Sequence, residues 1–152
     1  MSTLLRTLTH FACACLAAGP LASCSSASEP IATSFSHLAP TPVAVATGSS
    51  GKLSVAVYTT PTQPPPAGLD GVELVVTDAV TGAPVEGLSI AMTQWMPAMG
   101  HGASGAGPTF TEKGDGRYIS TAVSLFMPGE WQLRTQLSGP MNDFVVPAFD
   151  VP

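Results

Sequence analysis

The sequence predicts an all-β protein, a β-sandwich of about seven strands. Short segments in which apolar and polar residues alternate recur along the chain, and turn signals rich in Gly and Pro separate them. No segment of the 152 residues has a convincing helical period. The spacing of the segments is typical of two sheets packed face to face, with the Trp and Tyr side chains filling the core between them.

The first three expected strands share one pattern, in which every second residue is apolar. Residues 53–58 alternate cleanly and are followed by a Pro-rich break. Residues 72–77 form the second strand, which ends at a turn where Gly82 is free to take a positive φ. Residues 88–93 form the third strand, and their alternation places Met92 on the buried face.

The later strands are marked by turns as much as by alternation. Residues 109–111 precede a Lys-Gly-Asp-Gly turn, and residues 118–123 follow it. Residues 131–137 alternate with their Trp and Leu side chains on one side. Residues 143–151 form the last strand, and Pro147 indicates a sheet edge because proline cannot donate a hydrogen bond to a neighbouring strand.

The N-terminus predicts a bacterial lipoprotein signal peptide at residues 1–23. Arg6 precedes an apolar run, and the sequence Leu-Ala-Ser-Cys at residues 21–24 resembles the lipoprotein cleavage signal closely. We expect cleavage before Cys24, whose thiol would carry palmitate-type lipid and anchor the protein in a membrane. Cleavage by ordinary signal peptidase nearby is the alternative, and a transmembrane anchor is disfavoured because the apolar run is too short to span a bilayer.

Residues 24–50 are expected to be a flexible, disordered tether, because they are rich in Ser, Ala, Thr and Pro and almost uncharged. His37 in this segment is expected to be solvated. The folded domain is then residues 51–152. The uncharged Ser25 after Cys24 resembles outer-membrane lipoproteins, which implies a cell-envelope location on the periplasmic face of the outer membrane.

Charge and residue usage exclude several functions. The formal net charge is −5, which disfavours nucleic-acid binding because an acidic surface repels phosphate. Removal of Cys13 and Cys15 with the signal and acylation of Cys24 leave no thiol for catalysis or metal binding. We expect no enzymatic activity, because neither a nucleophile–base arrangement nor a spaced carboxylate pair is visible.

The segment from Trp95 to Gly102 contains the most informative residues of the chain. Met96, Met99 and His101 fall within six positions, in a stretch whose Gly and Pro content predicts a loop at the end of a strand. Thioether and imidazole donors favour Cu(I) over hard cations. The alternative is that the Met side chains cap the open end of the sandwich and that His101 is a surface residue.

The chain also resembles a known family, the YtkA-like domain, over most of residues 52–139. The resemblance is carried by Met-Pro-Ala-Met-Gly-His at residues 96–101 and by Met-Pro-Gly-Glu-Trp-Gln-Leu at residues 127–133. It implies an extracytoplasmic immunoglobulin-like β-sandwich related to the FixH family, and such domains often accompany copper handling, oxidase assembly or metal efflux. It implies Met96, Met99 and His101 as metal ligands. Met127 is a fourth candidate ligand, because it ends a strand just before a tight turn and is expected at the same end of the sandwich.

Two functions are therefore expected as alternatives. The first is a lipid-anchored extracytoplasmic copper-binding module, a chaperone or buffer for Cu(I) that meets a copper-handling or envelope partner protein. The second is a non-catalytic immunoglobulin-like interaction module of an envelope complex, in which the Met and His loop is a packing plug or a partner surface.

Overall fold

A computed structural model describes residues 41–152, and these residues form only β-strands, turns and irregular segments. The ten strands are β1 (Ala44–Thr47), β2 (Leu53–Thr60), β3 (Gly68–Asp78), β4 (Ser89–Met96), β5 (His101–Gly102), β6 (Thr111–Gly114), β7 (Arg117–Leu125), β8 (Gly129–Ser138), β9 (Asp143–Val145) and β10 (Ala148–Val151). The all-β prediction is confirmed, with more strands than the seven or so expected. Among these residues there is no helix long and apolar enough to cross a membrane.

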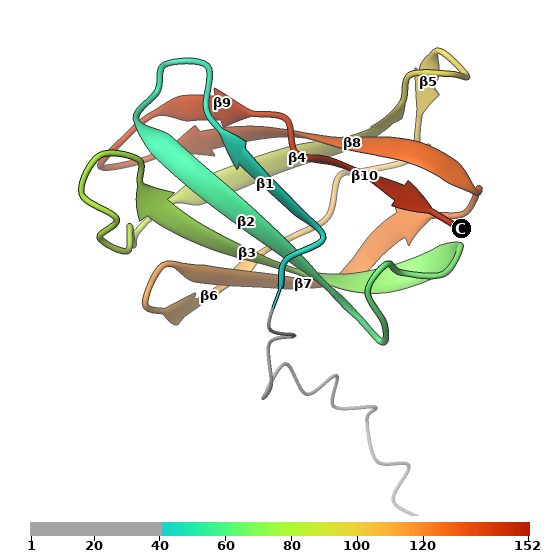
Figure 1. Cartoon of the computed structure of the whole chain (residues 1–152), viewed down its shortest axis with the longest axis horizontal. Coiled ribbons are helices and arrows are strands. Elements are labelled where there is room, and N and C mark those ends of the chain that lie inside the picture. The colour runs from blue at the N-terminus through green and yellow to red at the C-terminus, as the bar shows by residue number, and fades with distance from the viewer. Residues whose placement is uncertain (1–40) are drawn as a thin grey trace, which may run out of the picture. The chain divides into compact units, whose positions relative to one another are not determined.

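The strands form two antiparallel sheets that face each other (Figure 1). One sheet has the order β1-β2-β3-β7-β6, and the other has the order β10-β8-β4-β5. The last expected strand, residues 143–151, is split in two. Both halves pair with β8, β9 at Thr135–Leu137 and β10 at Gly129–Gln132. The split falls at Pro147, whose carbonyl accepts a hydrogen bond from the Leu133 N–H at 2.9 Å.

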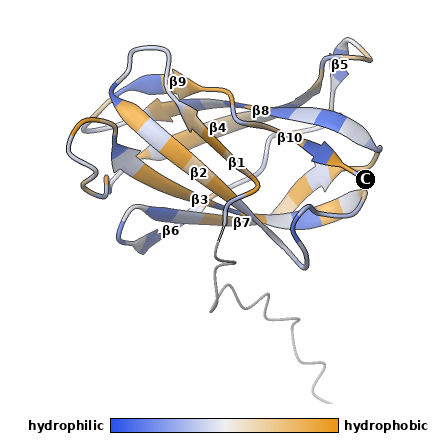
Figure 2. Ribbon diagram, in the orientation of Figure 1, coloured by the Kyte–Doolittle hydropathy of each residue, from blue (hydrophilic) through white to orange (hydrophobic). Residues whose placement is uncertain are grey.

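The core lies between the sheets and follows the alternation seen in the sequence. The buried apolar side chains include Leu53, Val55 and Val57 of β2, and the hydrophobic colour is concentrated along β2, β3 and β4 (Figure 2). Tyr118 and Trp131 are 1% and 2% exposed, as expected for core aromatics, and Met92 is also buried. Residues 41–152 contain no Cys, so packing and hydrogen bonding hold the sheets together, at about 1.5–3 kcal/mol per large buried side chain.

The sandwich begins before the expected boundary at residue 51. β1 lies inside the segment 24–50 that was expected to be a tether, and it pairs with β2 from Ala44↔Val57 to Thr47↔Ser54. β1 is a short edge strand whose side chains are half-buried or exposed, so residues 44–47 lack the apolar alternation of a strand with one buried face. The expected signal peptide, Cys24 and His37 lie outside the described residues.

A buried carboxylate, that of Asp143, ties the β1–β2 turn to the other sheet. Its Oδ1 accepts hydrogen bonds from the N–H groups of Ser50 and Phe144, both at 2.9 Å, and its Oδ2 accepts from Lys52 and Leu53, both at 3.1 Å. A side chain at Gly48 would begin 2.2 Å from this carboxyl group. Burial would raise the pKa of Asp143, but the backbone N–H donors outweigh it and hold the pKa well below its ordinary value.

A second buried polar group, the Tyr118 hydroxyl, holds the connection between β3 and β4. It donates a hydrogen bond to the Val85 carbonyl at 3.0 Å and accepts one from the Leu88 N–H at 3.1 Å. The chain enters β7 through Gly116, which has a φ of +69°. A Cβ at that glycine would lie 2.3 Å from the Val76 carbonyl oxygen, so no other residue fits there.

Asp70 is a buried acid that lacks full hydrogen bonding. It lies where the pairing of β3 with β7 shifts register, opposite the core residue Val123. Paired residues of antiparallel strands point to the same face, so the carboxyl group faces the core. Its side chain is 2% exposed and its Oδ2 has no hydrogen-bond partner among the described residues. Burial therefore raises the pKa of Asp70.

Candidate functional site

The Met and His segment is a β-hairpin rather than the continuous loop that was expected. Trp95 and Met96 are the last residues of β4, and they pair with Gly102 and His101 of β5. The turn is only residues 97–100, closed by the hydrogen bond from the Gly100 N–H to the Met96 carbonyl at 3.0 Å. The strand continues through Met96 because the alternation of β4 is unbroken until proline follows. The hairpin end projects from the sandwich (Figure 1).

The two methionines of the hairpin lie in different surroundings. Met96 is 3% exposed and belongs to the core, and its methyl group lies 3.4 Å from where a side chain at Gly129 would begin. Met99 is 57% exposed in the hairpin turn. The expectation that Met96 lies on an open loop is therefore wrong: it is a buried strand residue, whereas Met99 is accessible.

His101 and Met127 come together at one pocket, although 25 residues of sequence separate them. The pocket has a volume of about 320 Å³ and lies between the hairpin and the β7–β8 connection. Its lining residues are His101, Gly102, Ala103, Ser104, Ser124, Phe126, Met127 and Trp131. The prediction that Met127 lies at the same end of the sandwich as the His101 segment is confirmed. Met96 and Met99 are not among the lining residues.

The His101 side chain is exposed and one of its ring nitrogens has a local partner. Nδ1 lies 3.2 Å from the carbonyl oxygen of Gly102. A carbonyl can only accept, so a hydrogen bond here places a proton on Nδ1, and in the neutral imidazole the lone pair is then on Nε2. An imidazole whose second nitrogen is held by a backbone carbonyl is the arrangement found in metal-binding histidines.

Trp95, next to Met96 in the sequence, is excluded from this pocket. Its ring lies on the outer face of the β4–β8 sheet, where the Arg134 guanidinium is 4.3 Å from the ring centroid. Arg134 in turn donates hydrogen bonds to the Gln132 side chain. The expectation that both Trp residues fill the core is therefore correct for Trp131 only.

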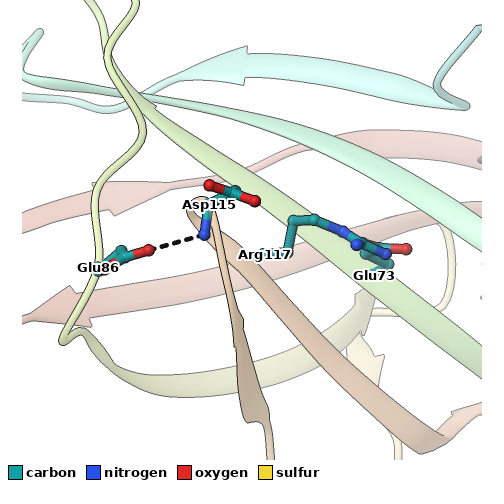
Figure 3. A network of polar contacts seen from close by, with 4 residues as sticks. All are labelled: Glu73, Glu86, Asp115 and Arg117. Carbon is teal, nitrogen blue, oxygen red and sulfur yellow. Dashed lines mark hydrogen bonds and ion pairs between the residues drawn. The ribbon is translucent and has the colours of Figure 1, made fainter.

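Four charged residues that do not line the pocket, Glu73, Glu86, Asp115 and Arg117, lie around the β6–β7 hairpin (Figure 3). Arg117 forms an ion pair with Glu73, whose side chain is fully buried, and this hydrogen bond raises the pKa of Arg117. The Asp115 N–H donates to a Glu86 carboxylate oxygen at 2.7 Å. Within residues 41–152, no three His, Cys, Asp or Glu side chains form a group that could hold a metal ion. Thioether sulfurs are not among those four ligand types.

Two residues of the pocket were not anticipated as part of a site. Phe126 is 66% exposed at its rim. Trp131 also lines the pocket, and its indole N–H donates a hydrogen bond to the Met127 carbonyl at 2.8 Å. This bond links the two ends of the Met-Pro-Gly-Glu-Trp motif. The Met-Pro-Gly-Glu-Trp spacing was visible in the sequence, but the hydrogen bond across it was not.

Comparison with known proteins gives one finding on identity. No curated protein and no solved structure matches the chain. The model of the family described as YtkA-like matches residues 50–136, which is more than half of the chain and contains the hairpin, the pocket and the Met-Pro-Gly-Glu-Trp motif. The chain therefore belongs to the YtkA-like family.

Proposed function

We propose that this protein is an extracytoplasmic, lipid-anchored copper-binding module, a chaperone or buffer for Cu(I). The observation that carries the proposal is that His101 and Met127 line the same open pocket. Met99, on the exposed turn that ends at His101, is the third donor in the proposal. Soft thioether and borderline imidazole donors suit Cu(I), and thioethers resist the disulfide formation that removes thiols in an oxidising compartment.

In this proposal Met96 has a structural role. It pairs directly with His101, so its side chain starts on the same face, but it is buried against Gly129. It would hold the base of the hairpin against the core, while His101, Met127 and Met99 bind the ion. Lipidation of Cys24 would hold the domain at the cell envelope, on the periplasmic face of the outer membrane. Cys24→Ser should abolish incorporation of labelled palmitate.

Competition with a Cu(I) chelator tests the metal site. The full chain should carry Cys13→Ser, Cys15→Ser and Cys24→Ser, because thiolates would outcompete thioethers for Cu(I). Met99→Leu/His101→Ala/Met127→Leu should lower the affinity at least about 100-fold, since loss of one supporting group near a metal already costs 10–100-fold. Met92→Leu is the matched control, because it replaces a buried thioether elsewhere on β4. Equal affinity in the triple variant and the parent would refute the proposal.

A second function is favoured by the exposed apolar rim. Phe126 and Met99 are 66% and 57% exposed at the same end of the sandwich, which suits an immunoglobulin-like interaction module without a metal. Two substitutions separate the functions. Met99→Leu removes a thioether but conserves apolar volume, whereas Phe126→Ser removes apolar surface and leaves every proposed donor. Loss of partner capture only with Phe126→Ser would favour the interaction module.

A further inference from the structure

Trp131 is tied to the proposed metal ligand Met127 by a direct hydrogen bond. The indole N–H donates to the Met127 carbonyl four residues earlier, at 2.8 Å. Trp131 is 2% exposed and lines the same pocket as Met127 and His101. Its backbone is fixed by the pairing of β8 with β10, where it lies opposite Phe149. The indole is thus a rigid point to which the β7–β8 connection is attached.

The chain between Met127 and Trp131 contains a glycine, Gly129, that allows the indole–carbonyl hydrogen bond to form. Gly129 has a φ of +122°, a conformation that other residues rarely adopt. A Cβ there would lie 3.4 Å from the Met96 methyl group, so the glycine lets the chain pass close over the core. The chain then turns back within four residues, which brings the Met127 carbonyl to the indole. Without the indole N–H, this partly buried carbonyl would lose its partner.

We infer that Trp131 is a positioning residue for Met127: its indole N–H fixes the backbone from which the thioether reaches the pocket beside His101. The inference rests on the proposed function for its effect on copper, but the hydrogen bond acts on the β7–β8 connection whether or not a metal binds. A ligand whose backbone is held in place binds more tightly, because less conformational freedom is lost on binding.

Three variants of the full chain with Cys13, Cys15 and Cys24 replaced by Ser provide the test. Trp131→Phe keeps a buried ring and removes the N–H. Trp95→Phe is the matched control, because that indole lies on the outer face against Arg134. Leu137→Ala is the stability control, because it destabilises the core at the opposite end of β8. Hydrogen exchange of residues 126–130, Cu(I) affinity and the number of sulfur neighbours of copper by X-ray absorption are measured.

We expect faster exchange of residues 126–130 in Trp131→Phe, a Cu(I) affinity lower by about tenfold, and fewer sulfur neighbours around copper. Trp95→Phe should match the parent in all three measurements. Unchanged exchange in Trp131→Phe would overturn the inference, and so would an equal loss of affinity in Leu137→Ala. If Trp131→Phe does not fold, Trp131→Tyr replaces it in the same comparison.

Failure of the proposed function gives a different result. The parent chain would then show no competition with the chelator, and the exchange of residues 126–130 alone would decide the inference. Faster exchange in Trp131→Phe would support positioning of Met127 by Trp131 in a protein that binds no copper.

Discussion

Asp143→Asn tests how the two sheets are joined at the β1–β2 turn. The carboxylate accepts four backbone hydrogen bonds, two at each oxygen. Asparagine has only one acceptor oxygen, and its amide group would point two N–H donors at the remaining backbone N–H groups. The carboxylate lies so close to Gly48 that a Cβ there would be 2.2 Å away, so the asparagine side chain has little room to turn toward that side.

The expected loss of stability follows from the two bonds that asparagine cannot accept. A hydrogen bond to a charged group contributes about 1.5–3 kcal/mol, so losing two costs roughly 4 kcal/mol. This is a large part of the 5–15 kcal/mol that stabilises an ordinary domain, so the variant should fold but unfold at much lower urea concentration. Asp150→Asn, at an exposed aspartate of β10, is the matched control and should change stability little.

The pH dependence provides a second check. An unfolded aspartate has a pKa near 3.9, and the folded pKa of Asp143 lies well below that value. As the pH falls below about 5, the unfolded chain binds the proton first, so the stability contributed by Asp143 decreases by at most about 1.4 kcal/mol per pH unit. Urea unfolding of the parent and Asp143→Asn should therefore differ most at pH 7 and less at pH 3. A difference below about 1 kcal/mol at pH 7, or one independent of pH, would refute this reasoning.

Four further substitutions have defined outcomes in urea unfolding. Asp70→Asn should stabilise the protein by about 1 kcal/mol at pH 7. Burial raises the folded pKa of Asp70 above its unfolded pKa, so the cost of burying the ionised carboxylate grows as the pH rises. A gain that persists at pH 3 would contradict this explanation. Tyr118→Phe should cost about 2–3 kcal/mol by leaving a buried N–H and a carbonyl unpaired, and a neutral effect would exclude this role. Gly116→Ala should cost at least about 2 kcal/mol through positive φ and backbone contact, so a stable variant would mean that the turn can rearrange. Met96→Leu should cost less than about 1.5 kcal/mol and leave Cu(I) affinity unchanged, whereas weaker binding would make Met96 a ligand.

The fold class and the central strands could be predicted from the sequence because each of them buries one face. In β2 and β8 every second residue is buried, and all of these buried residues are apolar except one threonine in each strand. β1 escaped prediction because an edge strand with half-buried side chains has little apolar alternation. β9 and β10 could not be separated by sequence, since their division at Pro147 depends on where each half meets β8.

The candidate site was predicted only in part because residue type does not give side-chain direction. Met96 and Met99 are equivalent as sulfur donors in the sequence, but one ends a strand facing the core and the other lies in an exposed turn. The meeting of His101 with Met127 depends on β4 and β8 being neighbours in one sheet. That pairing is a long-range property that local patterns do not contain.

The four-residue turn at the tip of the β4–β5 hairpin carries the proposed ligand Met99 but is not part of the packed core. Residues 97–100 are all exposed, and of the four only Gly100, with a φ of +67°, has a backbone conformation that favours glycine. By contrast, Cβ atoms at Gly102 and Gly107 would collide with the backbone of β4. Natural or laboratory evolution can therefore lengthen or recode the tip to change which ion or partner is selected, while Gly102 and Gly107 cannot gain a side chain without moving the backbone of β4.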